Sequence, residues 1–168
     1  VRVLQTAGVS RILVVTGYQS EVLQEHLAHT GVMFGHNERF AQTKMFDSVR
    51  LGLAAMGDSC EKILLTPADV PLVQPDTVRT LLAQSGDCVR PLYHGQPGHP
   101  LLLHRSVVPA LLACSGEDGL RGAIGEAGLT IRDVEVEDEG TILDMDTPQD
   151  YEALLHKKGD RHIRVRNQ

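Results

Sequence analysis

The 168-residue chain is predicted to form an α/β domain with a mainly parallel sheet that helices cover on both faces. Two short apolar runs, residues 11–16 and 62–66, have the composition of buried strands. Segments with the helical spacing of apolar residues alternate with strand-like segments along the chain. The length suits a single well-packed domain, and 42% hydrophobic with 23% charged residues is typical of a folded globular protein.

In the first half of the chain, glycines and polar residues mark the ends of the predicted elements. Residues before Gly8 have the pattern of the end of a helix closed by a glycine. Because a domain seldom begins at the end of a helix, we expect the native protein to have preceding sequence. Ser20 is the expected N-cap of a helix whose Val22, Leu23 and Leu27 face inward. The predicted elements are a helix end at residues 1–8, a strand at 11–16, a helix at 20–29, a weaker strand at 32–34, a polar loop at 35–44 and a helix at about 48–56.

In the second half, proline positions indicate where helices begin. Pro75 suits the first turn of a helix, and Thr147, Pro148 and Asp150 suit the cap and first turn of the last one. The predicted elements are a strand at 62–66, a helix at 75–84, strands at 87–93 and 99–103 around a turn at 95–98, a helix at 106–113, a loop at 115–119, a short helix at 120–127, a strand at 130–136, a brief strand at 142–144 and a final helix. We expect one domain over residues 1–156 and a polar basic tail or linker over 157–168.

Charge and cysteine content exclude several classes of protein. The net charge of −6 argues against a nucleic-acid binder and means that a phosphate-rich ligand needs a metal ion or a local group of donors. The three cysteines, an odd number without Cys-x-x-Cys spacing, argue against a disulfide framework or a zinc site. A reducing cytoplasm is therefore the simplest setting. No apolar run has membrane-spanning length, and no secretory signal is visible.

Asp69 is a candidate metal ligand. In parallel sheets ligands bind beyond the carboxyl ends of the strands, and Asp69 follows the predicted strand 62–66. Pro67 and Pro71 flank it and stiffen the loop. A rigidly held carboxylate suits Mg²⁺, which prefers hard oxygen ligands and often takes further oxygens from substrate phosphates. Capping of a turn or helix by Asp69 is an equally good explanation when the residue is taken alone.

Asp144 and Asp146 form a second acidic segment at a predicted strand end. If the strand alternates regularly, both carboxylates point to the same side, where they repel each other unless a cation lies between them. Helix capping by Asp146 or Thr147 is the alternative. Two acidic loops at strand ends could converge on one metal ion, and we expect Asp69 and Asp146 to do so.

The other candidate residues are polar groups in loops. Histidines at 94, 99 and 104 are spaced by five, which matches neither a helix face nor a strand face, so a zinc site is not predicted. His99 precedes Pro100 at a turn and could meet a phosphate, although a structural histidine fits equally well. The polar segment 37–48 could contact a base or ribose, or could be a solvated loop. No Gly-x-Ser-x-Gly, Walker or Gly-x-Gly-x-x-Gly motif occurs.

Taken in order, the motifs resemble those of the MobA-like nucleotidyltransferases, and among them most closely the MocA-like molybdenum-cofactor cytidylyltransferases. The resemblance covers almost the whole chain, and its strength lies in the order of six individually weak motifs. They are Val-Val-Thr-Gly-Tyr at 14–18, Asn37 to Phe40 with Met-Phe-Asp-Ser-Val-Arg-Leu-Gly-Leu at 45–53, Leu-Leu-Thr-Pro-Ala-Asp-Val-Pro at 64–71, Gly-His-Pro at 98–100, Gly-Glu-Asp-Gly-Leu-Arg at 116–121 and Asp-Met-Asp-Thr-Pro-Gln-Asp-Tyr at 144–151.

The resemblance implies a three-layer α/β/α Rossmann-like sandwich that transfers a nucleoside monophosphate, expected to be CMP, from a nucleoside triphosphate to a small phosphorylated acceptor such as molybdopterin. It implies that Asp69 and Asp146, with Asp144, bind Mg²⁺ and that His99 and Arg121 lie near the acceptor. The residues implied to lie near the nucleotide are Asn37, Met45, Ser48, Thr66 and Ala68. No nucleic-acid or membrane partner is expected.

The chain departs from the family pattern at its start. The family opens with a strand and a glycine-rich loop of the type Leu-Ala-Ala-Gly-x-Ser-x-Arg-Met-Gly-x-x-Lys, which nothing here matches. Lys44 also stands where the family often has glycine. We expect the intact protein, with that loop, to be the active form. Two alternatives stay open: the same fold with a sugar phosphate or other acceptor, and a non-catalytic nucleotide-binding module of a larger fusion protein.

Overall fold

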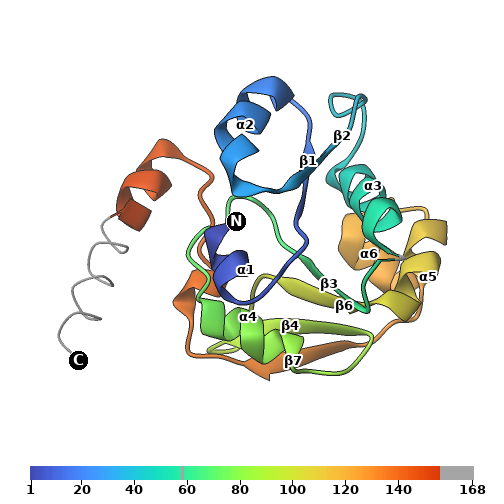
Figure 1. Cartoon of the computed structure of the whole chain (residues 1–168). Helices are drawn as coiled ribbons and strands as arrows, with labels where there is room; N and C mark the ends of the chain where they lie inside the picture. Colours follow the sequence, from blue (N-terminus) through green and yellow to red (C-terminus); the bar gives the residue numbers. More distant parts are fainter. Residues whose placement is uncertain (58, 156–168) are drawn as a thin grey trace.

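The computed structural model describes residues 1–57 and 59–155, and it has the alternating helices and strands of an α/β fold (Figure 1). The expected domain end at residue 156 and the tail at 157–168 lie outside the described residues. The helices are α1 (Arg2–Thr6), α2 (Ser20–Leu27), α3 (Met45–Met56), α4 (Pro75–Leu82), α5 (Val108–Ala113) and α6 (Gly119–Glu126), with 3₁₀ turns at Ala28–Thr30, Arg105–Val107 and Glu139–Thr141. Residues 148–155 are also helical.

Within the described residues the strands form two separate sheets. They are β1 (Leu13–Thr16), β2 (Met33–His36), β3 (Lys62–Leu65), β4 (Cys88–Tyr93), β5 (Gln96–Pro97), β6 (Leu101–His104) and β7 (Ile131–Glu135). The smaller sheet pairs β1 with β2 in parallel, and the larger has the order β3-β6-β4-β5 with β7 parallel to β4. The other three pairings of the larger sheet are antiparallel, so this sheet is mixed and not mainly parallel as the sequence predicts.

The larger sheet is the middle of three layers. Along β6, Leu101 and Leu103 belong to a core cluster with residues of α3, α5 and α6. Leu102, between them, belongs to a cluster with Leu81 of α4 and Val89 of β4. Successive side chains of a strand point to opposite faces, so this alternation requires helices on both sides of the sheet. Because α3, α5 and α6 cover one face and α4 the other, the predicted three-layer α/β/α arrangement is confirmed (Figure 1).

Helix α3 connects the smaller sheet to the rest of the core. A Cβ added to Gly52 of this helix would lie 3.3 Å from Val15 of β1, so the helix backbone packs directly on the strand. On its other side, Phe46 and Leu53 belong to the core cluster formed with α5 and α6. In the described chain, β1 and β3 each bond a strand along one edge and do not pair with each other. The two sheets are therefore joined through helix packing.

Helix α2 differs from the sequence prediction in its cap and in its buried face. Gln19 is the N-cap, with a left-handed φ of 51°, and Ser20 is the first helical residue. Val22 and Leu23 are 51% and 41% exposed, so the prediction that they face inward is wrong. The spacing of apolar residues shows that a helix has an apolar face, but only a neighbouring element can bury that face.

Two further boundaries differ from the prediction. Helix α3 begins at Met45, before the expected start near Ser48. The hairpin turns at His94 and Gly95, which have φ values of 47° and 80°, and this leaves residues 96 and 97 to pair as β5. Two central residues with positive φ form the tight turn that matches the twist of paired strands.

The brief strand expected at residues 142–144 is absent from the structure. A 3₁₀ turn at 139–141 leads into irregular backbone up to the last helix. The argument that strand alternation places Asp144 and Asp146 on one side therefore does not apply. The predicted cap of the last helix is confirmed, because the Thr147 amide and hydroxyl donate to the Asp150 carboxylate at 2.8 and 2.6 Å. These hydrogen bonds also lower the pKa of Asp150.

Candidate functional site

Asp69 lies where the sequence predicts, in the irregular loop that follows β3. The loop is anchored by Val70 and Val73, which are 9% and 7% exposed and pack in a cluster with residues of α1 and α4. Asp69 itself is half-buried between these anchors and the strand end. The Thr66 hydroxyl donates to the Pro67 carbonyl at 3.1 Å and so is used within the loop. The loop is held in place by apolar packing while its carboxylate keeps partial access to solvent.

The backbone of His99 is fastened to Thr141, in the turn at 139–141. The His99 amide donates to the Thr141 carbonyl at 2.8 Å. A Cβ on the preceding Gly98 would lie 2.6 Å from the same carbonyl oxygen, so this close approach needs glycine. Desolvation lowers the pKa of the His99 imidazole, and the charge of Asp69 partly opposes that effect. Although His99 is exposed as a whole, its ring therefore favours the neutral form at pH 7 and lies within electrostatic range of Asp69.

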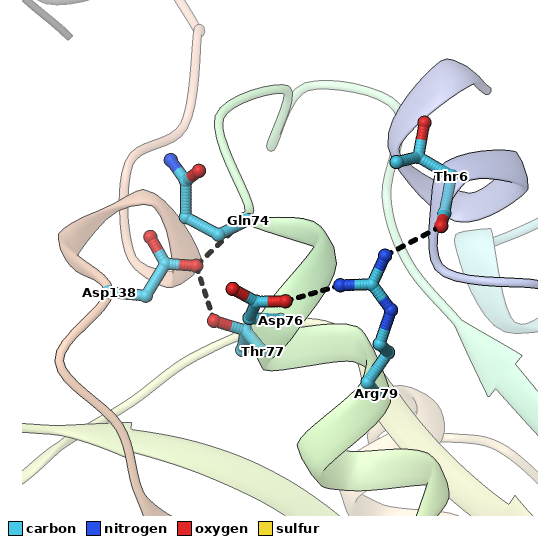
Figure 2. A network of polar contacts seen from close by, with 6 residues as sticks. All are labelled: Thr6, Gln74, Asp76, Thr77, Arg79 and Asp138. Atoms are coloured by element: carbon cyan, nitrogen blue, oxygen red, sulfur yellow. Dashed lines mark hydrogen bonds and ion pairs between the residues drawn. The ribbon is translucent and has the colours of Figure 1, made fainter. Parts of the chain in front are cut away.

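A buried carboxylate that the sequence prediction missed ties these segments together (Figure 2). Asp138 is 4% exposed, and its Oδ2 accepts from the Gln74 amide and the Thr77 hydroxyl, both at 2.7 Å. Its Oδ1 accepts from the Gly140 amide at 3.0 Å. Asp138 stands between two glutamates in the sequence, so its pattern resembles a solvated acidic run. Its burial and its hydrogen bonds to Gln74 and Thr77, which lie more than 60 residues away, distinguish it from such a run.

Asp144 and Asp146 are exposed and follow Thr141 along the chain. Among residues 1–57 and 59–155, no three or more His, Cys, Asp or Glu side chains are placed to hold a metal ion together. The convergence of Asp69 and Asp146 on one cation thus stays a prediction. Carboxylate oxygens are nevertheless the correct donor type for Mg²⁺, which commonly binds one or two carboxylates and completes its shell with phosphate oxygens and water.

The predicted nucleotide-binding segment forms a second group of residues, around the beginning of α3. Asn37 is 8% exposed, and its amide nitrogen donates to the hydroxyls of Thr43 and Ser48, each at 3.0 Å. Its carbonyl oxygen accepts from the Arg39 amide at 3.1 Å. Asn37 thus fastens the loop to the first turns of α3, with its side chain turned into the protein. Met45, in contrast, is 75% exposed at the start of the helix.

Two contacts bring the loop before α6 against the same helix start. The ammonium of Lys44 donates to the Glu117 carbonyl at 2.7 Å. Phe46 lies under Gly116, where an added Cβ would come within 2.1 Å of the ring. Arg121 is exposed on α6, a few residues beyond this contact. The structure therefore places the predicted nucleotide segment and the Arg121 segment side by side.

These features define an α/β domain with a candidate ligand site beyond a strand end. The three-layer α/β sandwich carries an acid after a strand end, a neutral imidazole near it and polar loops around a helix start. In α/β sheets ligands bind beyond the carboxyl ends of the strands, which is where this acid lies.

Residues 1–131 match the model of the MobA-like NTP transferase domain. This match covers most of the chain, so the protein belongs to the MobA-like NTP transferase family, and its fold is that of a nucleotidyltransferase.

The chain is similar to curated proteins and to solved structures, of which three are described. The molybdenum cofactor cytidylyltransferase of Escherichia coli K12 is 32% identical over 147 residues, which is 84% of this chain and 72% of that protein. The bifunctional protein GlmU of Geobacter metallireducens is 32% identical over 87 residues, or 51% of this chain and 18% of that protein. The structure of Rv0371c from Mycobacterium tuberculosis H37Rv in complex with manganese aligns with a TM-score of 0.77 at 25% identity and covers 92% of this chain and 83% of that one.

Within residues 1–57 and 59–155, no helix combines the length and the apolar content needed to cross a membrane.

Proposed function

We propose that the protein transfers CMP from CTP to the phosphate of a molybdopterin-type cofactor and releases pyrophosphate. The observation that carries this proposal is the 32% identity to a molybdenum cofactor cytidylyltransferase across 84% of the chain. The acid after β3 and the loop fastened to α3 are consistent with it, since a nucleotidyltransferase must hold both a triphosphate and a base.

The proposed reaction is a direct in-line displacement. A phosphate oxygen of the acceptor forms a bond to the α-phosphorus of CTP, and the bond from that phosphorus to the pyrophosphate oxygen breaks. The attacking oxygen is already anionic, so no strong general base is required. The chain then contributes mainly by orienting the two substrates and by stabilising charge.

We propose that Asp69 and Asp146, with Asp144, hold a divalent cation, taken here to be Mg²⁺. Oxygen donors of this kind suit Mg²⁺, and the similar structure of Rv0371c was determined with manganese, which favours similar donors. When bound, such a cation neutralises charge on the phosphates. The half-buried position of Asp69 supports its assignment as the more firmly placed ligand.

The remaining site residues are assigned by segment. Met45, Ser48, Thr66 and Ala68 are proposed to lie near the nucleotide, with Asn37 shaping that loop through its internal hydrogen bonds. His99 and Arg121 are proposed to lie near the acceptor. The neutral imidazole favoured at His99 could accept or donate a hydrogen bond there without adding a full charge.

Pyrophosphate release by the full-length protein, as its gene encodes it, tests the proposal. With CTP, Mg²⁺ and molybdopterin, Asp69→Ala should reduce turnover by about 10³-fold or more, or roughly 4 kcal/mol of transition-state stabilisation. Asp76→Ala is the matched control, because Asp76 is an exposed acid on the adjacent helix that pairs with Arg79. Near-normal turnover in Asp69→Ala would defeat the proposal.

A second candidate keeps the chemistry and changes the acceptor to a sugar phosphate. This alternative stays open because the family match over residues 1–131 does not specify an acceptor. A panel of CTP, GTP, ATP and UTP with molybdopterin and sugar phosphates would separate the two. Preference for a sugar phosphate by more than tenfold in kcat/KM would replace the first proposal. Nucleotide binding without turnover on any acceptor would instead indicate a non-catalytic binding module.

We also propose a cytoplasmic location. The three cysteines, Cys60, Cys88 and Cys114, are all free thiols, as expected in a reducing compartment.

A further inference from the structure

We infer that Asp138 is a positioning residue that holds the Asp69 loop, the His99 turn and the chain entering Asp144 and Asp146 in one arrangement. The inference rests on the nucleotidyl transfer proposed above. It adds to that proposal a residue outside the acidic motifs, which acts through hydrogen bonds to the protein.

The first connection runs from Asp138 to the end of the Asp69 loop. Gln74 is the N-cap of α4, but its own side chain makes no capping hydrogen bond. The Asp138 carboxylate binds this helix start from a distant part of the chain, accepting from the Gln74 backbone amide and the Thr77 hydroxyl, both at 2.7 Å (Figure 2). A negative group at a helix N-terminus is favoured by the helix dipole. The Asp69 loop is thus held at its beginning by β3 and at its end by the hydrogen bonds of Asp138 to the start of α4.

The second connection runs within the turn that Asp138 begins. Its Oδ1 accepts from the Gly140 amide at 3.0 Å, and its carbonyl accepts from the Thr141 hydroxyl at 2.8 Å. Gly140 packs so closely on the Asp69 loop that an added Cβ would lie 2.1 Å from the Leu72 carbonyl oxygen. The turn therefore bonds to the start of α4 and also lies directly against the loop.

The third connection runs from the turn to His99 and onward to the second acidic segment. Thr141 is fully buried, and its carbonyl accepts from the His99 amide at 2.8 Å. The chain leaves Thr141 toward Asp144 and Asp146, so the path of that segment starts from a fixed point. Three segments that the proposed reaction needs together all meet at this turn.

A role in positioning follows from the chemistry of the buried carboxylate. Hydrogen bonds to an ionised acceptor are shorter and stronger than neutral ones, and three of them determine the orientation of the carboxylate closely. Groups that orient site residues in this way typically cost about 10- to 100-fold in activity or metal affinity when they are changed. Asp138 itself is buried, so its effect on substrates must pass through the residues that it holds.

Asp76 provides a matched control on the same helix. It is an acid in the first turn of α4, but its side chain is 91% exposed and pairs with Arg79. Arg79 in turn donates to the Thr6 carbonyl of α1 at 2.8 Å (Figure 2). This second network joins α4 to α1.

The test compares Asp138→Asn, Asp76→Asn and Asp69→Ala in the full-length protein. Steady-state pyrophosphate release with CTP, Mn²⁺ and saturating molybdopterin, the proposed acceptor of CMP, gives kcat, the KM for CTP and the Mn²⁺ concentration for half-maximal rate. Rates are normalised to the folded fraction measured by circular dichroism. For Asp138→Asn we expect kcat to fall, or the half-maximal Mn²⁺ concentration to rise, by about 10- to 100-fold, with the KM for CTP within about threefold. Asp76→Asn should stay within about twofold in all three.

The outcomes distinguish failure of the positioning role of Asp138 from failure of the proposed nucleotidyl transfer. If folded Asp138→Asn keeps wild-type kcat and Mn²⁺ dependence and only melts earlier, the positioning role is refuted. If Asp138→Asn does not fold, Thr77→Val is used instead, because it removes one hydrogen-bond donor and leaves the Asp138 carboxylate in place. A several-fold change in kcat or in the half-maximal Mn²⁺ concentration of Thr77→Val supports the positioning role. Unchanged values refute it. If Asp69→Ala leaves turnover intact, the proposed function itself fails, whatever Asp138 does.

Discussion

Replacing Gly140 by alanine tests the contact between the turn at 138–141 and the loop that carries Asp69. The new Cβ would lie 2.1 Å from the carbonyl oxygen of Leu72 and 2.5 Å from its carbonyl carbon. Carbon–oxygen contacts in proteins are seldom closer than about 3.3 Å. The two backbone segments must therefore separate by roughly 1 Å. The hydrogen bond from the Gly140 amide to Asp138, now 3.0 Å, must lengthen or rotate to allow this.

The expected loss of stability follows from these two effects. Overpacking of a well-packed contact costs about 1–3 kcal/mol, and a hydrogen bond to a charged group contributes about 1.5–3 kcal/mol. Partial relaxation reduces their sum, so we expect Gly140→Ala to lower the free energy of unfolding by about 2–4 kcal/mol. At about 2–4 °C per kcal/mol for a domain of this size, Tm should fall by roughly 5–15 °C.

Urea and thermal denaturation of Gly140→Ala measure this loss directly. Gly125→Ala is the matched control, because a Cβ at this position in α6 has no atom within 4 Å. That change should leave stability equal or raise it by up to about 1 kcal/mol, since alanine favours a helix over glycine. A Gly140→Ala protein within about 0.5 kcal/mol of the wild type would refute the inferred contact, since neutral surface changes have effects of that size.

Three further predictions concern the pKa of the site histidine, the pH dependence of stability and the core. Desolvation lowers the pKa of His99, and the charge of Asp69 partly opposes this by raising it. Asp69→Asn should therefore lower the pKa of His99 further, as measured by NMR titration of the ring. A rise in this pKa would contradict the inferred electrostatic effect of Asp69. The folded-state pKa lies below the ordinary 6.5, so the stability contributed by neutral His99 should be lost as pH falls from 6.5 through the lowered value. Leu103 is fully buried in the main core cluster, so Leu103→Ala should lower the free energy of unfolding in urea by about 2–5 kcal/mol. Leu23 is 41% exposed, so Leu23→Ala should lower it only slightly. Equal losses in the two variants would contradict this position of the core.

Helix and strand order was predictable because it depends on neighbours in the sequence. The run Leu101 to Leu103 is apolar throughout, as expected of a strand that helices cover on both faces, and the structure buries all three residues. Thr147 and Asp150 carry the signature of a helix start, and both partners lie within four positions. The position of Asp69 after a strand followed from the same local pattern.

The errors arose where distant residues decide the outcome. Val22 and Leu23 have helical spacing, yet they are largely exposed, and spacing alone does not show which face is covered. The segment carrying Asp144 and Asp146 resembled a strand, but an element becomes a strand only when another strand pairs with it. Its backbone follows a turn held by other contacts.

Local sequence thus determined the α/β class, the order of elements and the acid beyond β3, because spacing, caps and prolines act over a few residues. Tertiary structure alone decided that Asn37 turns inward and that Asp138 is a buried acceptor in an otherwise acidic run. Two of the donors to Asp138, Thr77 and Gln74, lie 61 and 64 residues away at the start of α4. Burial of a carboxylate is stable only when such donors surround it, and the folded chain is what brings those donors together.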